Sequence, residues 1–445
     1  MNEELNSPNT VEKILTDARK SIKQGNFKEA YQNIKLGLEK DASSIDLYKM
    51  AVTCLRQLGN EKEAHLFSAA LENFQDAQPF SDLCRYFLSQ SGMPFRLAIS
   101  FLKRTLFLDP ERIDIATELA SAYNYYFQPC KAVEILSQLN LKQHFLSCKG
   151  QCETCIEFHW SKLLCNQTEG VQEFIDQSRN VLFRSSKDEA TLTALDKLDD
   201  ILDRLEAFPN PEPLVQNWHF IQYGAAILDY CDKDDDSLSI AGGRWVSLHG
   251  TFKSIATIIW RLKRFLTEMD WFPEKVVGLR DDIDSEIIGR ATAKILNLPF
   301  ELTASESLAQ AGILIVAANN WLLTDPSLKI VQENQTVFAL NLHWLQHSGY
   351  TPDVAGLMTQ FYHLPWKQDE YDPITKKALQ ASPDSRLATE IATELTKTSP
   401  EEDPHFDQIM EFYRDRADYL KVRHKGARRV RFLRDSPVPG AYYNF

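Results

Sequence analysis

The amino-acid sequence predicts a multidomain chain in which an N-terminal α-solenoid of helical hairpins precedes an α/β domain with a mainly parallel sheet and a mostly helical C-terminal extension. Three observations predict this: four alanines recur at a constant interval, three prolines crowd into residues 209–213, and short apolar runs alternate with helical patterns beyond them. The expected parts are a tail over 1–10, helical repeats over 11–206, a proline-rich linker over 207–213, the α/β domain over 214–365, and the extension with a basic tail over 366–445.

The alanine ladder carries the solenoid prediction. Ala30, Ala64, Ala98 and Ala132 each stand 34 residues after the previous one. A phrase rich in Gly, Asn or Pro precedes each of them and ends one helix, and the alanine begins the buried face of the next. A methyl side chain lets two helices approach closely where they cross. The pattern therefore predicts a repeated helix–turn–helix with alanine at each close crossing.

Residues 11–140 resemble the tetratricopeptide repeat family. The fourth repeat matches its pattern best, because Leu119, Ala120, Tyr123 and Ala132 occupy the family's leucine, small, tyrosine and packing-alanine positions. The first repeat supplies small residues at Ala18, Ala30 and Gly37. The second and third repeats depart from the pattern, so irregular hairpins are expected there. The residues that depart are Val52, Leu71, Tyr86 and Thr105.

The resemblance implies a scaffold that binds a partner protein or peptide in a groove lined by the first helix of each hairpin. The groove residues expected by this analogy are Arg19, Lys49, Thr53, Arg56 and Asn124. Such donors suit an extended acidic or polar peptide. Leu15 and Arg19 replace the lysine and asparagine of the clamp that chaperone-binding members use, so a chaperone C-terminus is not the expected ligand. The alternative for each residue is a solvated helix face.

Composition limits the class of partner. A formal net charge of −13 argues against nucleic acid or an anionic membrane as the main partner. The polar N-terminus, Met1 to Asn6, does not resemble a signal peptide, and the longest apolar runs are too short to span a membrane. These features predict a soluble cytoplasmic protein. In that setting the eight cysteines are interpreted as reduced thiols, and no cofactor is expected.

Helical periodicity continues past the ladder and then changes character. Amphipathic stretches over Glu169–Arg184 and Asp188–Glu206 suggest a degenerate fifth repeat and a capping helix. Beyond the prolines we expect strands over Phe220–Tyr230, Arg244–His249, Val276–Leu279, Phe300–Thr303, Ile313–Ala317 and Thr336–Leu342. Helices are expected over Phe252–Met269, Ser285–Leu296, Glu306–Ala311, Ser385–Thr396 and His405–Val422.

Two acidic residues offer an enzymatic alternative. Asp281 and Asp282 follow the strand Val276–Leu279, and ligands of α/β sheets bind at the carboxyl ends of strands. The arrangement faintly resembles the phosphoribosyltransferase family, which implies a transferase acting on a phosphorylated or nucleotide-like ligand. However, Asp284 and Glu286 stand where that family has a phosphate loop, and they would repel phosphate. The simpler interpretation is that Asp282, Asp284 and Glu286 complement the positive N-terminal end of the following helix. Asp284 or Ser285 is then expected to cap that helix.

A cysteine cluster offers a metal-binding alternative. Cys148, Cys152, Cys155 and His159 have a spacing that could ligate a metal, and the three cysteines resemble the cluster motif of radical-SAM enzymes. The same spacing forms one stripe along a helix, and ligands spread along one straight helix cannot converge on one ion. Buried free thiols are the favoured interpretation.

The remaining motifs carry less information. Gly242-Gly243-Arg244 precedes a strand and is expected to form a turn. Basic residues gather near the C-terminus between Lys421 and Arg434, and they are expected to contact acidic residues of the chain itself or of a partner. Val430 and Phe432 alternate with Arg429 and Arg431, which predicts a terminal strand with one solvated face. The sequence therefore predicts a protein-interaction scaffold with a fused, non-catalytic α/β domain, and a transferase is the alternative.

Overall fold

The computed structural model describes residues 8–90, 94–141, 153–185, 188–231, 239–240, 242–303, 308–345, 349–367, 370–372, 377–379 and 384–438. The chain divides into two compact units, one spanning Met1–Leu195 and the other beginning at Asp196. The division falls within a long helix, α12 (Glu189–Ala207), which precedes the proline-rich segment 207–213.

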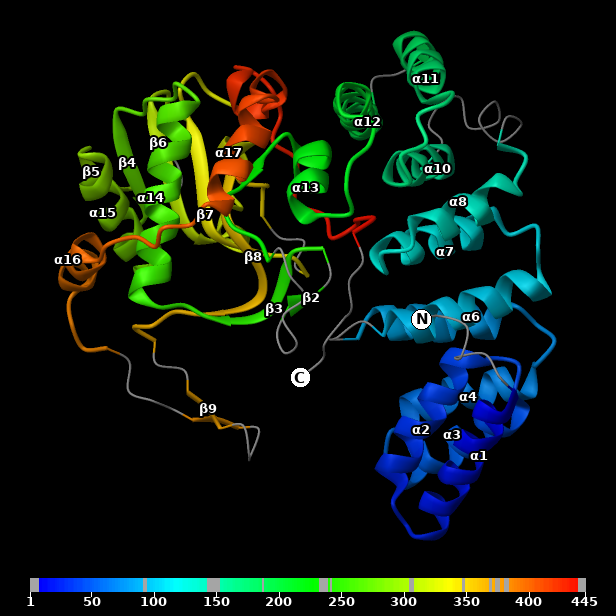
Figure 1. Cartoon of the computed structure of the whole chain (residues 1–445). Helices are drawn as coiled ribbons and strands as arrows, with labels where there is room; N and C mark the ends of the chain where they lie inside the picture. The colour runs from blue at the N-terminus through cyan, green and yellow to red at the C-terminus, as the bar shows by residue number, and fades with distance from the viewer. Residues whose placement is uncertain are drawn as a thin grey trace. The chain divides into compact units, whose positions relative to one another are not determined.

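The first unit is built from helical hairpins, as the sequence predicts (Figure 1). Four hairpins follow one another along the chain: α1 (Pro8–Lys23) with α2 (Phe27–Lys40), α3 (Ile45–Gln57) with α4 (Glu61–Glu72), α5 (Gln78–Leu88) with α6 (Phe95–Leu108), and α7 (Ile113–Tyr125) with α8 (Pro129–Ser137). Two further helices, α10 (Glu153–Leu164) and α11 (Val171–Ser185), precede α12.

The alanine ladder is confirmed. Ala30, Ala98 and Ala132 are fully buried and Ala64 is 1% exposed. Each of them lies near the start of the second helix of its hairpin, where a larger side chain would separate the helices.

The turns repeat as regularly as the alanines. Gly25, Gly59 and Phe127 have φ values of 79°, 74° and 60°, and each stands five residues before its alanine. The next amide bonds back to the carbonyl five residues earlier, as in Asn26 N–H to Ser21 O at 2.9 Å. This is a Schellman turn, whose left-handed residue closes the end of a helix.

A fifth hairpin is present with a shifted register. Asn166 ends α10 with φ 57°, and the Gln167 amide bonds to the Lys162 carbonyl in the same Schellman pattern. Five residues after Asn166 stands Val171, fully buried at the place of the ladder alanine. The turn lies 39 residues after Phe127. The longer interval hides this repeat from a search at constant period.

Aromatic side chains of the second and third hairpins pack against one another. Tyr48 makes ring contacts with Phe67, Phe74, Phe80 and Phe101, at centroid distances of 5.4–6.4 Å. The third hairpin also reaches the first, because Ser100 Oγ of α6 donates to the Leu38 carbonyl of α2 at 2.5 Å. Hairpins one to three therefore close around one aromatic core.

The second unit contains a mainly parallel sheet, as the sequence predicts. Its strands are β1 (Ala226–Ile227), β2 (Ser239–Ile240), β3 (Arg244–His249), β4 (Lys275–Leu279), β5 (Phe300–Thr303), β6 (Ile313–Asn319), β7 (Thr336–His343) and β8 (Val354–His363). They lie in the order β2-β3-β8-β7-β6-β4-β5, with β1 also paired to β8. Pairing is parallel except between β2 and β3.

Helices and irregular segments cover this sheet. α14 (Phe252–Glu268) packs on β8, and α15 (Ile283–Leu296) packs on β4 and β6. α16 (Ala388–Lys397) packs against both helices and α17 (His405–Arg414) against α14. Leu323, Leu328 and Tyr350, from segments around the short 3-10 turns η3 (Asn320–Leu322) and η4 (Pro326–Lys329), form a second apolar cluster with strand residues. A small hairpin of β9 (Glu370–Asp372) and β10 (Lys377–Leu379) stands apart from this sheet.

Several expected elements are wrong. The strand expected over Phe220–Tyr230 begins as helix, because α13 (Val215–Tyr223) extends to Tyr223, and the strand β1 that follows has two residues. All nine residues of α13 are buried, so it shows no amphipathic period. The helix expected over Glu306–Ala311 is not helical at residues 308–311, and its first residues lie outside the described ranges. The long helix expected over His405–Val422 stops at Arg414 and continues as 3-10 turns.

The central strand β8 is absent from the expectations, although β7, β3 and β1 all pair with it. The basic C-terminal stretch is also different from its expectation. Residues 428–438, here called the C-terminal strap, run along the unit with Arg429 buried and Arg431 exposed. Arg429 therefore points inward, opposite to the expected alternation. No helix in the described part of the chain is long and apolar enough to cross a membrane.

Candidate functional site

The expected groove residues of α1 and α3 are exposed and linked by charge. Arg19 Nη2 of α1 lies 2.8 Å from Asp46 Oδ2 of α3, and Lys49 Nζ lies 3.8 Å from the other oxygen of that carboxylate. Thr53 Oγ1 donates to the Lys49 carbonyl at 3.0 Å. Arg56, one turn further along, is exposed and has no ion pair with any described residue. These four side chains form a polar surface on the first helices of hairpins one and two.

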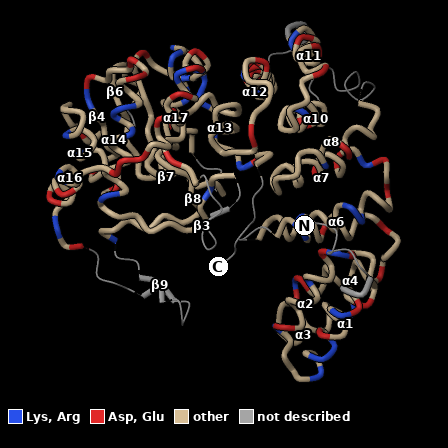
Figure 2. Tube along the Cα trace, in the orientation of Figure 1, with Lys and Arg blue, Asp and Glu red and all other residues tan. Residues whose placement is uncertain are grey.

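This surface is basic although the chain is acidic. α1 carries four basic and two acidic residues, and α3 carries two basic and one acidic. The positions of these residues can be followed on the trace in Figure 2. With a net charge of −13 for the whole chain, the acidic excess must come from other segments. A ligand attracted to α1 and α3 would therefore carry negative charge.

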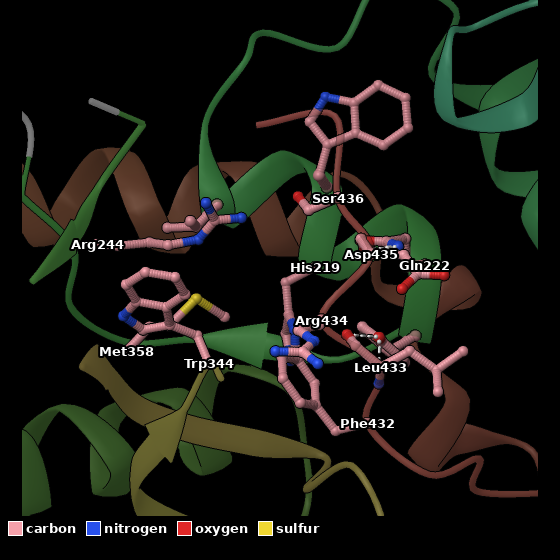
Figure 3. A pocket seen from close by; sticks show the side chains of 13 residues that line it. His219, Gln222, Arg244, Trp344, Met358, Phe432, Leu433, Arg434, Asp435 and Ser436 are labelled. Carbon is pink, nitrogen blue, oxygen red and sulfur yellow. Dashed lines mark hydrogen bonds between the residues drawn. The ribbon is translucent and has the colours of Figure 1, made fainter. Parts of the chain in front are cut away.

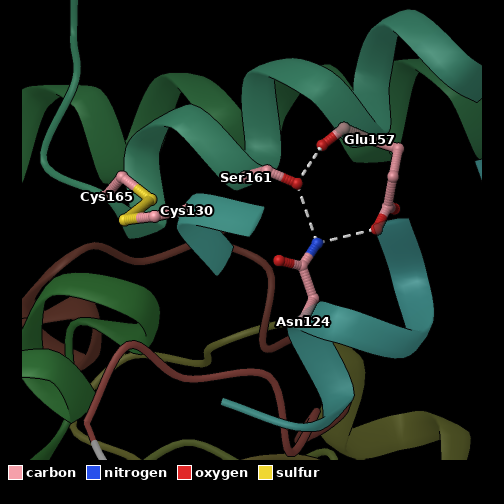
Figure 4. The surroundings of a disulfide bond; sticks show 5 residues. All are labelled: Asn124, Cys130, Glu157, Ser161 and Cys165. Atoms are coloured by element: carbon pink, nitrogen blue, oxygen red, sulfur yellow. Dashed lines mark hydrogen bonds between the residues drawn. A yellow bond between two sulfur atoms is a disulfide. The ribbon is translucent and has the colours of Figure 1, made fainter. Parts of the chain in front are cut away.

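Asn124 has a different environment from the other expected groove residues. It is fully buried, and its amide nitrogen donates to Glu157 Oε1 and Ser161 Oγ of α10, each at 2.8 Å (Figure 4). Thr117, two turns before Asn124 on the same face of α7, forms a hydrogen bond with Thr154 of α10 at 2.7 Å. Asn124 thus joins the fourth hairpin to the fifth and is not available to a ligand in this structure.

The assignment of all cysteines as reduced thiols is wrong for one pair. Cys130 of α8 and Cys165 at the end of α10 form a disulfide, with Cα atoms 5.7 Å apart (Figure 4). The two cysteines are 35 residues apart in the sequence, and the packing of the fifth hairpin against the fourth brings them together. Among the described residues Cys54 and Cys84 are buried free thiols, and burial raises the pKa of Cys54 to about 11.

The metal-binding alternative falls partly outside the described residues, because Cys148 and Cys152 lie there. Cys155 and His159 stand one turn apart on α10. Cys155 is 3% exposed, and the His159 ring stacks on Phe174 of α11 with centroids 4.1 Å apart. Burial, with Lys162 nearby, lowers the pKa of His159 to about 3. Within the described residues no group of three or more potential ligands is gathered.

The two aspartates of the enzymatic alternative have separate roles. Asp282 is the N-cap of α15, where its carboxylate accepts from the Ser285 amide at 2.8 Å and from Ser285 Oγ at 2.5 Å. Asp281 is exposed. The Ala318 amide in turn donates to Ser285 Oγ at 2.9 Å, which ties the helix start to β6. The N-cap of α15 is therefore Asp282, and the expectation that Asp284 or Ser285 caps this helix is wrong.

A tryptophan occupies the neighbouring space at the start of α15. Asp284, 4% exposed, accepts a hydrogen bond from Trp366 Nε1 at 2.8 Å and lies 2.5 Å from Lys367 Nζ. Trp366 is itself 4% exposed. Its indole and the lysine ammonium use the acceptors of Asp284 that a substrate or cation would otherwise contact.

Polar residues that sequence reasoning missed join the carboxyl ends of β6 and β7 to the middle of β8. Asn341 of β7 donates to Asn319 Oδ1 of β6 at 2.7 Å and accepts from Thr359 Oγ1 of β8 at 2.9 Å. The His343 amide donates to Asn320 Oδ1 at 2.9 Å. No motif signals this set, because its members come from separate strands. Their mutual bonds hold the strand ends in register.

The basic C-terminal residues are mostly bound within the α/β unit. Arg423 Nη2 donates to the Met269 carbonyl at 2.8 Å, and Lys421 lies 3.0 Å from Asp200 of α12. Lys425 pairs at the surface with Glu333 at 2.8 Å. The expectation that these residues meet acidic groups of the chain itself holds for Lys421, for Lys425 and for Arg429, which pairs with Asp353.

Comparisons with known proteins cover the helical part of the chain at low similarity. No protein-family model matches the sequence, and no curated protein matches it. Solved structures that match include the MamA protein, with 14% identity and a TM-score of 0.23, covering 41% of this chain and 97% of that chain. PilF of Pseudomonas aeruginosa matches with 15% identity and a TM-score of 0.24, covering 45% of this chain and 93% of that one. The description as a TPR-like solenoid rests on the hairpins, turns and buried alanines described above.

Proposed function

We propose that this protein is an interaction scaffold whose helical unit binds an extended acidic or polar segment of a partner protein on the surface formed by α1 and α3. The observation that carries the proposal is the exposed basic set Arg19, Lys49 and Arg56, on the first helices of two consecutive TPR-like hairpins. Charge-assisted hydrogen bonds from such side chains to carboxylates are the strongest that an exposed surface offers.

The geometry supports a reversible contact. The Asp46 carboxylate lies 2.8 Å from Arg19 and 3.8 Å from Lys49. A ligand carboxylate would therefore replace Asp46 as the partner of these two side chains. Arg56 would contribute a guanidinium that has no internal ion pair to break among the described residues. Binding through exposed charges should weaken as salt rises, because ions screen them.

The α/β unit is proposed as a fused module without catalytic activity. This rests on Asp282 acting as a helix cap and on Trp366 and Lys367 engaging Asp284. The cytoplasmic location expected from the sequence remains a prediction. The Cys130–Cys165 disulfide is the feature to test it against, because structural disulfides persist mainly in oxidising compartments.

The test uses the full chain and a synthetic library of extended acidic, neutral and basic peptides. Selected peptides should be acidic, and the double variant Lys49→Glu/Arg56→Glu should bind them about tenfold more weakly or worse. The matched control is Lys28→Glu/Lys103→Glu, which makes the same charge change at exposed positions on second helices. Equal losses in both variants, or selection of peptides without acidic residues, would refute the proposed surface.

A further inference from the structure

Polar contacts join the fifth hairpin to the fourth. α10 packs on α7, and residues 37 positions apart meet there: Thr117 Oγ1 lies 2.7 Å from Thr154 Oγ1, and Asn124 Nδ2 donates to Ser161 Oγ at 2.8 Å. On each helix the two contacts are about two turns apart, so they lie on one face. The side-chain carbonyl of Asn124 is buried in this joint and has no hydrogen-bond partner among the described residues (Figure 4). An unpaired buried acceptor costs free energy and weakens the joint.

The hydrophobic core of hairpins one to four is built without α10. The buried members of that core run from Ala18 to Leu136, and within the described ranges none belongs to α10 or α11. Phe158 of α10 packs against the edge of this core as a partly buried side chain. Because apolar burial is the main stabilising term between packed helices, the first four hairpins remain packed together without the fifth.

A disulfide closes one end of this joint. Cys130 lies in the first turn of α8 and Cys165 directly follows α10, with their Cα atoms 5.7 Å apart (Figure 4). Cys130 is exposed and Cys165 is half-buried, so a small thiol can reach the bond. Exposed disulfides are typically labile or regulatory, whereas the structural disulfides of secreted proteins resist reduction. The location of this bond is therefore that of a labile one.

The helix ends around the two sulfurs favour breaking the bond in one direction. Cys130 is the second residue of α8, where the positive N-terminal end of the helix stabilises an anion, and the exposed Lys131 follows it. Cys165 stands at the C-terminal end of α10, whose partial charge is negative. A thiolate is therefore more stable on Cys130 Sγ than on Cys165 Sγ, and Cys130 is the better leaving group.

We propose that the Cys130–Cys165 disulfide is a reversible redox latch that holds the fifth hairpin against the fourth, so that the Asn124 face of α7 is covered only in the oxidised protein. The reductant is a dithiol. Its thiolate attacks Cys165 Sγ, and Cys130 Sγ leaves with the electron pair of the bond. The second thiol of the reductant then attacks the mixed disulfide, which releases Cys165 and leaves the reductant oxidised by two electrons. The two protein sulfurs take up the two protons that the dithiol loses.

Once the bond is reduced, α10 is held by noncovalent contacts alone, and its separation uncovers Thr117 and Asn124 on α7. This is the helix face on which the sequence predicts groove residues. In reducing compartments disulfides are typically transient and redox-sensing, which agrees with the cytoplasmic location that the sequence predicts. The latch lies on hairpins four and five and does not depend on the peptide surface proposed for α1 and α3.

The test applies hydroxyl-radical footprinting to the full-length protein after equilibration with oxidised or reduced dithiothreitol and removal of the reagent under nitrogen. Labelling of Phe158 should rise about twofold or more in the reduced protein, because separation of α10 exposes this side chain. Labelling of Tyr48, which is fully buried in the core of hairpins one to three, should not change. The control is the double variant Cys130→Ser/Cys165→Ser, in which Phe158 should be labelled strongly after either treatment.

Mass spectrometry after alkylation measures the reduced fraction of the cysteine pair in the same samples. Labelling of Phe158 should rise with that fraction and fall again on reoxidation, while circular dichroism shows that the reduced protein remains helical. Equal Phe158 labelling in the oxidised and the fully reduced wild type would overturn the proposal. So would Tyr48 labelling that rises as much as that of Phe158, since reduction would then unfold the hairpins instead of releasing one. A pair that stays reduced when oxidised dithiothreitol is restored would overturn it as well.

Discussion

Arg429 and Asp353 form an ion pair at 2.7 Å whose side chains are 1% and 3% exposed. Arg429 of the strap also donates to the Leu328 carbonyl at 3.1 Å and to Gln335 Oε1 at 2.8 Å. Asp353 also accepts from the Val337 amide at 2.8 Å. Because nearly every donor and acceptor is used, the pair fixes the strap to the amino ends of β7 and β8.

The first prediction follows from this pair. Arg429→Met should lower the free energy of unfolding of the α/β unit by about 3–5 kcal/mol, because it leaves the Asp353 carboxylate buried without its partner. Urea denaturation followed by tryptophan fluorescence reports this unit, since Trp160 is the one tryptophan that precedes Asp196. The control is Lys425→Met, which breaks an exposed pair and should cost less than about 1 kcal/mol. A loss no larger for Arg429→Met than for the control would contradict this account.

A second prediction concerns the alanine ladder. Ala98→Leu adds volume where two helices cross and should destabilise the helical unit by about 1–3 kcal/mol. Ala190→Leu makes the same change at an exposed position of α12 and should have little effect. Hydrogen exchange of amides in α5 and α6 measures the difference locally. Unchanged protection in the Ala98 variant would mean that this position is not a tight crossing.

A third prediction concerns acid stability. Burial lowers the pKa of His343 to about 4 and that of His219 to about 3, below the unfolded value near 6.5. A group whose pKa is lower in the folded state than in the unfolded state stabilises the fold at pH values above its unfolded pKa. That stability is lost as pH falls toward the folded pKa. Between roughly pH 6 and pH 4 the free energy of unfolding of the α/β unit should therefore fall as the pH falls, because these rings take up protons when the unit unfolds.

The matched variants isolate one ring. His343→Gln should reduce the slope of unfolding free energy against pH by up to about 1.4 kcal/mol per pH unit in this window, because one proton fewer is taken up. His65→Gln, at an exposed position of α4, should leave the tryptophan-detected slope as it is. Denaturation curves collected at intervals of half a pH unit decide between these outcomes; identical slopes in wild type and His343→Gln would count against the buried, neutral imidazole.

A fourth prediction concerns the disulfide. It closes a segment with a sequence separation of 35 residues, so removing it should cost the helical unit about 4 kcal/mol under oxidising conditions. Cys130→Ser and Cys165→Ser should each show this loss. In excess reductant both variants and the wild type should have the same free energy of unfolding. Cys231→Ser, in the other unit, is the control. Mass spectrometry of the alkylated protein gives the state of the bond directly, and a fully alkylated wild-type pair in protein purified without reductant would contradict the assignment.

Much of the fold could be predicted from local pattern. The alanines at 34-residue spacing locate four hairpins, and β5 and β3 have their expected bounds because apolar runs between breakers define strands. α13 could not be predicted, since a helix buried on every side has no polar face. The fifth hairpin was only suggested, because Val171 replaces alanine and the interval lengthens to 39 residues.

The candidate sites were less accessible to sequence reasoning. Arg19, Lys49, Thr53 and Arg56 lie at exposed positions of α1 and α3, where position on the helix was a sufficient guide. Asn124 is buried instead, because α10 packs on α7, which depends on a later part of the chain. His219, Arg244 and Arg434 line one cavity of the α/β unit (Figure 3), although more than two hundred residues separate His219 from Arg434 in the sequence. No local spacing in the sequence signals such a convergence.

The most direct test of the scaffold proposal is hydrogen exchange of the full-length protein with and without a saturating acidic peptide selected from the library. The account predicts slower exchange in α1 and α3, over Pro8–Lys23 and Ile45–Gln57, with loss of this protection in Lys49→Glu/Arg56→Glu. Protection confined to the α/β unit, or protection of α1 and α3 that survives the double charge reversal, would contradict it.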